Sequence, residues 1–357
     1  MQRSDIAHRR LYNQHIAEAT FATPADVVRS LGAVQAQDYL GGLWAIALRT
    51  HDATAAAVEQ AIAERTIIRT WPMRGTLHFV AAPDIRWMLD LLTPRIVARS
   101  ARRLQQLDLD DATLAHSKDM IGQALQGGKQ LSRPALYQVL DAAHISPAGQ
   151  RGIHILARLA QDGFICFGTR EGKQQTFALL DEWAPAARTM ERADALAELA
   201  RRYFTSHGPA TLHDFVWWSG LATADARAGL EGAKPQLTHE EIDGRTYWLS
   251  ASPPPVEAAS ATAYLLPPYD EYTVAYRDRS AVLSPEYAAR ADSGNGIFSP
   301  TMVVDGQVVG TWIRAAKKNT LVITLRPFRT LSGAEHRAFT TAAHRYGKFL
   351  EMPVTVL

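Results

Sequence analysis

A repeated order of elements most constrains what this chain of 357 residues can fold into. In residues 117–183, three segments with apolar residues at helical spacing are followed by two alternating runs that flank Glu171-Gly172. Ser132 is expected to cap the second helix, with Pro134 in its first turn. Three helices followed by a hairpin are typical of a winged helix.

Two looser copies of this order lie on either side. Residues 190–249 repeat it, with Thr211 before the second helix and a hairpin turn at Asp243-Gly244. Residues 5–82 repeat it with a helix that starts at Thr23-Pro24, a helix at 55–62, and strands at 67–71 and 76–80. Such self-similarity indicates a repeat architecture.

The last quarter of the chain has a different pattern. Residues 252–255 (SPPP) predict a linker, and residues 302–309 predict a hairpin with a two-residue turn. Further strands are expected at 311–313 and 321–325, and a closing helix at 331–348. We predict an α+β, mainly α fold of three tandem winged helices and a C-terminal β-rich domain. The expected domains are residues 1–103, 104–183, 184–251 and 256–357.

Composition and charge exclude several classes of protein. No apolar run reaches the roughly 18 residues of a membrane span, and the first residues lack the apolar core of a secretory signal. A single cysteine, Cys166, excludes an internal disulfide and a cysteine-built metal cluster. We therefore expect a cytoplasmic protein without metal or cofactor. Residues 181–259 carry 7 basic and 12 acidic side chains, so an anionic partner would meet the more basic ends of the chain.

Basic side chains on the middle repeat are candidates for contact with DNA phosphates. Its third helix offers Arg151, and its hairpin offers Arg170 and Lys173. A winged helix can place a helix in the major groove while its hairpin touches the backbone. Winged helices also bind proteins, and solvated basic residues occur on any helix, so both interpretations stay open.

Three further arginines have the same two interpretations. Arg74 is expected at the tip of the first hairpin, beside a phosphate or simply in solvent. Arg277 and Arg279 would share one face of a strand and could contact DNA. The alternative for this pair is an ion pair with Asp270 or Asp278.

Familiar catalytic motifs are missing from the sequence. There is no His-Glu-x-x-His helix, no phosphate-binding glycine loop and no Gly-x-Ser-x-Gly turn. Asp270-Glu271 is an acidic pair, but adjacent residues usually point in different directions, so a turn or capping role is favoured over joint acid/base chemistry. His78 lies in an apolar strand pattern and is expected to be a hydrogen-bonded core histidine.

Aromatic and thiol side chains are assigned to the core. Trp71 and the pair Trp217-Trp218 are interpreted as core residues, although an aromatic ring can also stack on a base. Cys166 is expected to be buried and inert.

Gln35-Ala36-Gln37 follows the second predicted helix of the first repeat. Side chains two residues apart on a helix point in different directions. An extended or turn segment is therefore needed to bring both amides to one point. Gly41-Gly42 is interpreted as the break in the helix. Two solvated glutamines are the plain alternative.

The surroundings of this motif resemble one family. Residues 30–39 (SLGAVQAQDY) resemble the motif region of the AlkZ/YcaQ-type winged-helix DNA glycosylase family. The same holds for residues 69–78 (RTWPMRGTLH), 265–272 (LLPPYDEY), 276–280 (YRDRS) and 303–312 (VVDGQVVGTW). The likeness runs across nearly the whole chain, and the ordered set is specific where Gln-x-Gln alone is not.

The resemblance implies tandem winged helices around duplex DNA and monofunctional excision of alkylated purines, in some members from interstrand cross-links. The two catalytic positions of the family fall on Gln35 and Gln37, and Asp38 lies one residue too late for the Gln-x-Asp branch. The Gln-x-Gln branch is associated with self-resistance to DNA-alkylating natural products, and general DNA repair is the other role. The expected partner is double-stranded DNA with alkylated purines, bound by a monomer near the nucleoid.

Two other functions remain possible at this point. A non-catalytic winged-helix regulator would bind a specific duplex sequence and release no base. A scaffold that uses its winged helices for protein contacts would have little affinity for DNA even at low salt.

Overall fold

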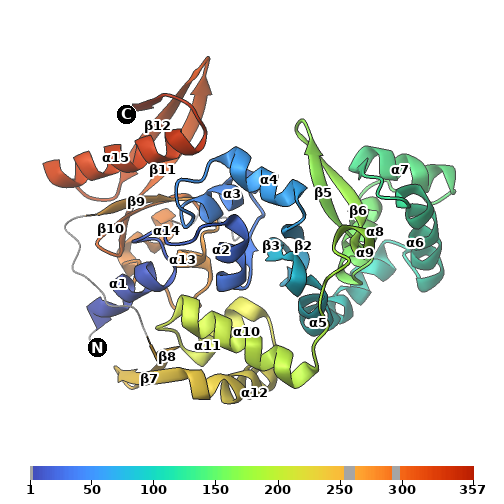
Figure 1. Ribbon diagram of the computed structural model, residues 1–357, viewed down its shortest axis with the longest axis horizontal. Coiled ribbons are helices and arrows are strands. Elements are labelled where there is room, and N and C mark those ends of the chain that lie inside the picture. Colours follow the sequence, from blue (N-terminus) through green and yellow to red (C-terminus); the bar gives the residue numbers. More distant parts are fainter. Residues whose placement is uncertain (1–2, 253–261, 292–297) are drawn as a thin grey trace. The chain divides into compact units, whose positions relative to one another are not determined.

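The structure is a computed structural model that describes residues 3–252, 262–291 and 298–357, and it contains both helices and strands (Figure 1). The chain divides into two compact units, residues 59–195 on the one hand and residues 1–58 with 196–357 on the other. This division is coarser than the four predicted domains. Its boundaries fall inside the first and the third of them.

Residues 59–195 contain a mixed set of helices and strands. The elements are the C-terminal half of α4 (Ala55–Ala63), β2 (Ile67–Met73), β3 (Thr76–Ala81), the 3-10 helix η1 (Ala82–Asp84), α5 (Ile85–Gln106), α6 (Asp111–Leu125), β4 (Leu131–Ser132), α7 (Arg133–Ala142), α8 (Arg151–Gln161), β5 (Ile165–Glu171), β6 (Gln174–Leu179) and α9 (Leu180–Trp183).

The predicted order of three helices and a hairpin is confirmed within this unit. α6, α7 and α8 precede the antiparallel pair β5 and β6, and β4 joins the pair in the order β4-β6-β5. The Ser132 hydroxyl accepts the N–H of Ala135 at 3.4 Å and caps α7, as expected, with Pro134 in the first turn. Apolar residues from all three helices and both strands form one buried cluster.

A long helix that the sequence pattern did not predict follows the first hairpin. α5 runs for 22 residues and contains Pro94. Side chains in its first half, such as Trp87, Met88 and Leu92, are buried, whereas most side chains in its second half are exposed. The predicted hairpin before it is present, because β2 and β3 pair antiparallel around Arg74-Gly75.

The other unit joins the N-terminal residues to the last 160 or so positions of the chain. Its elements are α1 (Arg3–Asn13), α2 (Pro24–Leu31), β1 (Val34–Gln35), α3 (Tyr39–Ala47), α10 (Arg192–His207), α11 (Leu212–Ser219), α12 (Thr223–Ala233), η2 (Lys234–Gln236), β7 (Leu237–Ile242), β8 (Arg245–Ser250), β9 (Ala263–Leu266), α13 (Glu271–Val274), η3 (Pro285–Tyr287), α14 (Ala288–Ala291), β10 (Thr301–Val304), β11 (Gln307–Lys317), β12 (Thr320–Pro327), α15 (Gly333–Phe349) and β13 (Val354–Val356).

Here too the predicted starts and turns of the elements are confirmed. The side chain of Thr23 accepts the N–H of Asp26 and caps α2. Thr211 and Asp214 form a reciprocal capping box at the start of α11. β7 and β8 pair around Asp243-Gly244, whose positive φ angles suit a two-residue hairpin turn.

A five-stranded sheet with the order β13-β12-β11-β10-β9 is the largest sheet of this unit. The predicted hairpin at 302–309 is present as β10 and β11, and α15 lies along the sheet (Figure 1). The Tyr346 ring of α15 packs between Trp44 and Trp312, with ring centres 5.1 and 5.0 Å away. Of the predicted linker, residues 253–255 lie outside the described residues.

Candidate active site

The two glutamines lie in a non-helical segment, as predicted. α2 ends at Leu31, Gly32 follows with φ +80°, and Gln35 closes the two-residue strand β1. The next helix, α3, begins only at Tyr39, with the Asp38 side chain as its N-cap. A positive φ of this kind costs glycine little, so Gly32 turns the chain out of α2 and into the motif.

The interpretation of Gly41-Gly42 as the break was wrong, because both residues lie inside α3. A Cβ on residue 41 would lie 3.2 Å from the ring of Pro268 and 2.7 Å from the Asp38 carboxylate. Gly41 therefore allows α3 to pack closely against the segment that follows β9. The turn that exposes the motif is made nine residues earlier, at Gly32.

Gln35 and Gln37 differ in exposure. Gln35 is 8% exposed, whereas Gln37 is exposed and lines a hollow of about 440 Å³. The other walls of this hollow, which we call the glutamine hollow, are Asp38, Pro268, Tyr269, Phe298, Ser299, Pro300, Thr311, Trp312, Ile313 and Arg326. One amide thus meets solvent in a concave site, and the other is almost covered.

The backbone of Gln35 is held by a carboxylate from the distant helix α13. Glu271 is fully buried, and its Oε1 accepts the N–H of Gln35 at 3.0 Å. Its Oε2 accepts the indole N–H of Trp218 at 2.9 Å. A buried carboxylate is stable only when donors surround it, so this arrangement ties the position of the motif to α11 and α13.

Asp270 has a separate partner, as adjacent residues usually do. Its two oxygens accept hydrogen bonds from Arg49 at 2.8 and 3.0 Å, and both side chains are fully buried. Asp270 also caps α13 by accepting the N–H of Tyr272 at 2.9 Å. The predicted capping role is confirmed for Asp270, while Glu271 serves the motif segment instead.

His207 lies next to Glu271, and both side chains are fully buried. Its Nε2 lies 3.5 Å from Oε2 of Glu271, and its Nδ1 lies 2.8 Å from the hydroxyl of Ser206. Burial lowers the pKa of His207 from 6.5, against the opposing effect of Glu271.

The loop that carries the opposite wall of the glutamine hollow is fixed by two tryptophans. The indole N–H of Trp44 donates to the carbonyl of Leu265 at 2.7 Å, and that of Trp312 donates to Leu266 at 2.9 Å. These two bonds hold the end of β9, from which Pro268 and Tyr269 extend into the wall. Tyr269 has φ +61°, an uncommon value for a residue with a side chain.

Comparison with known proteins decides the family. Residues 28–349 match the model of the family described as DNA glycosylase AlkZ-like. The chain belongs to the AlkZ-like DNA glycosylase family. It is therefore an enzyme of the class that cleaves N-glycosyl bonds in DNA.

Two matches from Streptomyces sahachiroi accompany this result. The chain is 27% identical over 324 residues to a protein named interstrand DNA cross-link repair glycosylase, covering 85% of each. The solved structure of the DNA glycosylase AlkZ shares its fold, with a TM-score of 0.79 and 22% identity over 100% of both chains. The mixed α and β fold of this glycosylase is thus that of a known DNA glycosylase.

Among the residues described, neither a membrane-spanning helix nor a cluster of metal-ligating side chains is present. No helix in residues 3–252, 262–291 and 298–357 is long and apolar enough to cross a membrane. In the same ranges, no three His, Cys, Asp or Glu side chains gather as they would around a metal ion.

Four other side chains of the glycosylase behave as the sequence predicted. His78 is fully buried, and its Nδ1 lies 2.9 Å from the carbonyl of Thr76, so it is a core histidine. Cys166 is buried, and burial raises the pKa of its thiol. Trp71 and Trp218 are core residues. The assignment of Trp217 to the core was wrong, because this side chain is 45% exposed.

The candidate DNA contacts in residues 59–195 fall into two groups. Lys173 is exposed in the turn between β5 and β6, whereas Arg74, at the hairpin tip with φ +55°, is partly buried and its guanidinium lies 3.2 Å from Nε2 of His78. Arg170 is partly buried, 3.7 Å from Glu59. Arg151 begins α8, and its guanidinium donates to the carbonyls of Leu107, Asp108 and Ser146. Arg151 is thus already bound within its own unit.

Arg277 and Arg279 do not lie on a strand, which corrects the prediction. They belong to the irregular segment after α13. The alternative ion pairs were also wrong, because Asp270 pairs with Arg49 and Asp278 pairs with Arg245. Arg277 is exposed, and the guanidinium of Arg279 packs beside the ring of Phe298 at 4.5 Å.

Sequence reasoning missed the contact made by Glu271 and the exposure of Trp217. The hydrogen bond from Gln35 to Glu271 joins residues 236 positions apart, and no local pattern reports such a contact. Trp217 was detectable, because two adjacent residues on a helix face different directions and one tryptophan of the pair had to point outward.

Proposed function

We propose that the protein is a monofunctional DNA glycosylase that hydrolyses the N-glycosidic bond of cationic N7- or N3-alkylated purines, with Gln35 and Gln37 as its catalytic residues. One observation supports this above the others. The amide of Gln37, which does not titrate, lines a concave site, and the backbone of the nearly buried Gln35 is fastened by a buried carboxylate. A site of this kind orients a water molecule but does not deprotonate it.

The chemistry matches a leaving group that needs no acid. An N7- or N3-alkylated purine is a cation and departs as a neutral base when the bond to C1′ breaks. The sugar then has oxocarbenium character, water adds to C1′, and the proton of that water passes to solvent. The amide oxygens accept a hydrogen bond from this water, and its correct placement lowers the barrier.

The proposal extends to bulky adducts and to purines joined in interstrand cross-links. The relative that covers 85% of this chain is named for interstrand cross-link repair. In this chain Gln37 is exposed on the wall of an open hollow, so an adduct that stays attached to the opposite strand has room to reach it. Self-resistance to alkylating natural products and general repair are the two cellular roles that such an activity serves.

DNA would be held by basic side chains of both units. We assign phosphate contact to Arg74, Arg170 and Lys173 in residues 59–195 and to Arg277 and Arg279 in the other unit. Lys173 and Arg277 are exposed, as phosphate binding requires. Arg151 is the weakest candidate of the original set, because its donors already bond to three carbonyls.

The test is base release from duplex DNA that carries a single N7-methylguanine. The purified protein should release this base and leave abasic sites, with little release of uracil from a matched duplex. Gln37→Ala and Gln35→Ala should each lower kcat by about 10²-fold or more, the loss expected when a catalytic water is misplaced. Gln236→Ala, an exposed glutamine far along the chain, is the matched control and should keep full activity.

Two outcomes would contradict the proposal. Comparable release of uracil and N7-methylguanine would show that the site does not depend on a cationic leaving group. Full activity in both glutamine variants would show that the catalytic groups lie elsewhere.

A further inference from the structure

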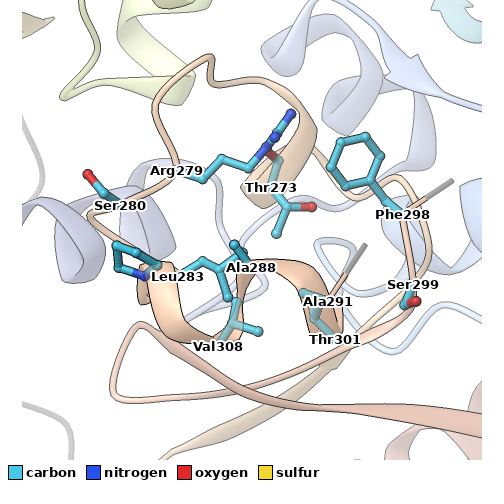
Figure 2. A pocket seen from close by; sticks show the side chains of 11 residues that line it. Thr273, Arg279, Ser280, Leu283, Ala288, Ala291, Phe298, Ser299, Thr301 and Val308 are labelled. Carbon is cyan, nitrogen blue, oxygen red and sulfur yellow. The ribbon is translucent and has the colours of Figure 1, made fainter. Parts of the chain in front are cut away.

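A second hollow, of about 290 Å³, adjoins the glutamine hollow, because Phe298 and Ser299 belong to the walls of both. Figure 2 shows its lining, with Arg279, Thr273 and Phe298 in the upper part of the view. Leu283, Ala288 and Val308 lie in the lower part and supply an apolar wall. We call this site the side pocket.

The polar wall of the side pocket offers donors that are held in place. The Nε of Arg279 donates to the carbonyl of Thr273 at 2.8 Å, and its guanidinium packs 4.5 Å from the ring centre of Phe298. Thr301 is only 4% exposed, and its hydroxyl has no hydrogen-bond partner within the described part of the chain. A buried hydroxyl without a partner is unfavourable, so a ligand that supplies an acceptor would satisfy it.

These features select one class of occupant. The guanidinium of Arg279 disfavours a cation, and the apolar wall of Leu283, Ala288 and Val308 suits a phosphate poorly. The volume is at the small end of the range for ligand pockets, about 300 Å³, which fits one ring system. An uncharged ring with a hydrogen-bond acceptor at its edge satisfies both walls.

We propose that the side pocket binds the uncharged, ring-bearing substituent of a bulky adduct while its alkylated purine lies at the glutamine hollow. Thr301 donates to the acceptor of that substituent, and the apolar wall covers the ring. The proposal rests on the proposed function, because the substituent reaches the pocket only when it is attached to a purine near Gln37. The ring-bearing substituent would thus distinguish a preferred adduct from a simple methylated base.

The experiment compares three adducts in the same duplex: N7-methylguanine, N7-benzylguanine and N7-(4-acetylbenzyl)guanine. The parent protein should show the highest kcat/KM for the acetylbenzyl adduct. Ala288→Phe, which adds a ring to an exposed position in the wall, should lower kcat/KM for both ring-bearing adducts about tenfold or more and leave N7-methylguanine unchanged. Ala338→Phe, which fills a separate hollow of about 360 Å³, is the matched control and should change nothing.

A second variant tests the hydroxyl. Thr301→Val keeps the shape of the side chain and should lower kcat/KM only for the acetylbenzyl adduct, by about two- to tenfold. Its Tm should not fall below that of the parent, because no hydrogen bond of the described structure is lost.

Each remaining result would overturn the proposal. If Ala288→Phe affects all three adducts alike or none of them, or if the parent shows no preference for a ring, the side pocket is not a subsite. If the parent releases N7-methylguanine and fails on both larger adducts, the pocket is likewise excluded. If the parent releases none of the three, the proposed function itself fails, and the side-pocket proposal fails with it.

Discussion

Asp270 and Glu271 show how adjacent residues of one motif take different tasks. Asp270 neutralises the buried Arg49 and caps α13, while Glu271 holds the backbone of Gln35 and the indole of Trp218. Neither carboxylate lines the glutamine hollow. Glu271 thus fixes the backbone of Gln35 without facing that hollow.

Replacing Glu271 with Gln should lower kcat by more than the loss of stability alone explains. One arm of the new amide would present hydrogens to a donor, either Gln35 N–H or the Trp218 indole, so the motif must move. We expect kcat for N7-methylguanine to fall at least about tenfold, since a shift of about 1 Å can cost about a hundredfold. The free energy of unfolding should fall by about 1–3 kcal/mol.

The measurement pairs single-turnover base release with a denaturant titration at the same temperature. Affinity for undamaged duplex should stay unchanged, because Glu271 is fully buried. Glu231→Gln, at a surface ion pair with Lys234, is the control and should alter neither quantity. A loss of activity that merely follows the unfolded fraction would show a structural role only.

Lys173 and Arg151 give opposite expectations despite their common charge. Lys173→Ala should weaken binding to any duplex and lower the slope of log K against log salt concentration by about one, because one phosphate contact is lost. Arg151→Ala should leave that slope unchanged and lower the stability of residues 59–195, because three carbonyls lose their donor. Binding titrations at several salt concentrations distinguish the two, and equal slopes for parent and Lys173→Ala would exclude the contact.

At the scale of elements, local signals predicted most helix starts and tight turns. Thr23, Ser132 and Thr211 cap the helices that they were expected to cap, because a capping side chain bonds within three residues of itself. Gly41 was misread because a glycine that breaks a helix and one that admits a neighbouring chain look alike in sequence. Only the position of Pro268 separates the two cases.

A substitution at Gly32 tests the turn that leads from α2 into the Gln35-Ala36-Gln37 segment. Gly32→Ala should destabilise the protein by about 1 kcal/mol or more, because alanine is strained at φ +80° and its Cβ would lie 3.3 Å from Trp218. Base release should fall as well, since Gly32 directs the chain toward Gln35. Gly128→Ala has nearly the same φ, +76°, with open space around it, so it should lose stability without losing kcat. Equal effects on kcat would contradict the role given to Gly32.

At the scale of the molecule, the repeat pattern did not predict how the chain divides. The first and last parts of the chain form one unit, in which Arg10 donates to the carbonyl of Pro209 and Gln14 to Tyr276. Repeats are visible as local periodicity, whereas the assembly of separate segments depends on buried polar contacts such as Arg49 with Asp270. The placement of the glutamines in a non-helical segment was predictable, and their support by Glu271 was not.

Two fragments of the chain should therefore differ: residues 59–195, which form one whole unit, and residues 196–357, which are the other unit without its N-terminal part. A fragment of residues 59–195 should unfold cooperatively on heating, because it contains its own buried cluster. A fragment of residues 196–357 should not, because Arg10, Gln14 and Arg49 would be missing from its interior. Thermal circular dichroism measures both, and a cooperative transition in the second fragment would contradict the expectation.

The bond between Gln35 and Glu271 spans 236 positions, which has a consequence for synthesis. A nascent chain that has emerged only as far as α12 already contains both glutamines but lacks the carboxylate that fastens the first. The proposed site therefore lacks this support until the chain has been synthesised past residue 271. A chain that terminates before residue 271 should thus fail to release alkylated bases and to produce abasic sites.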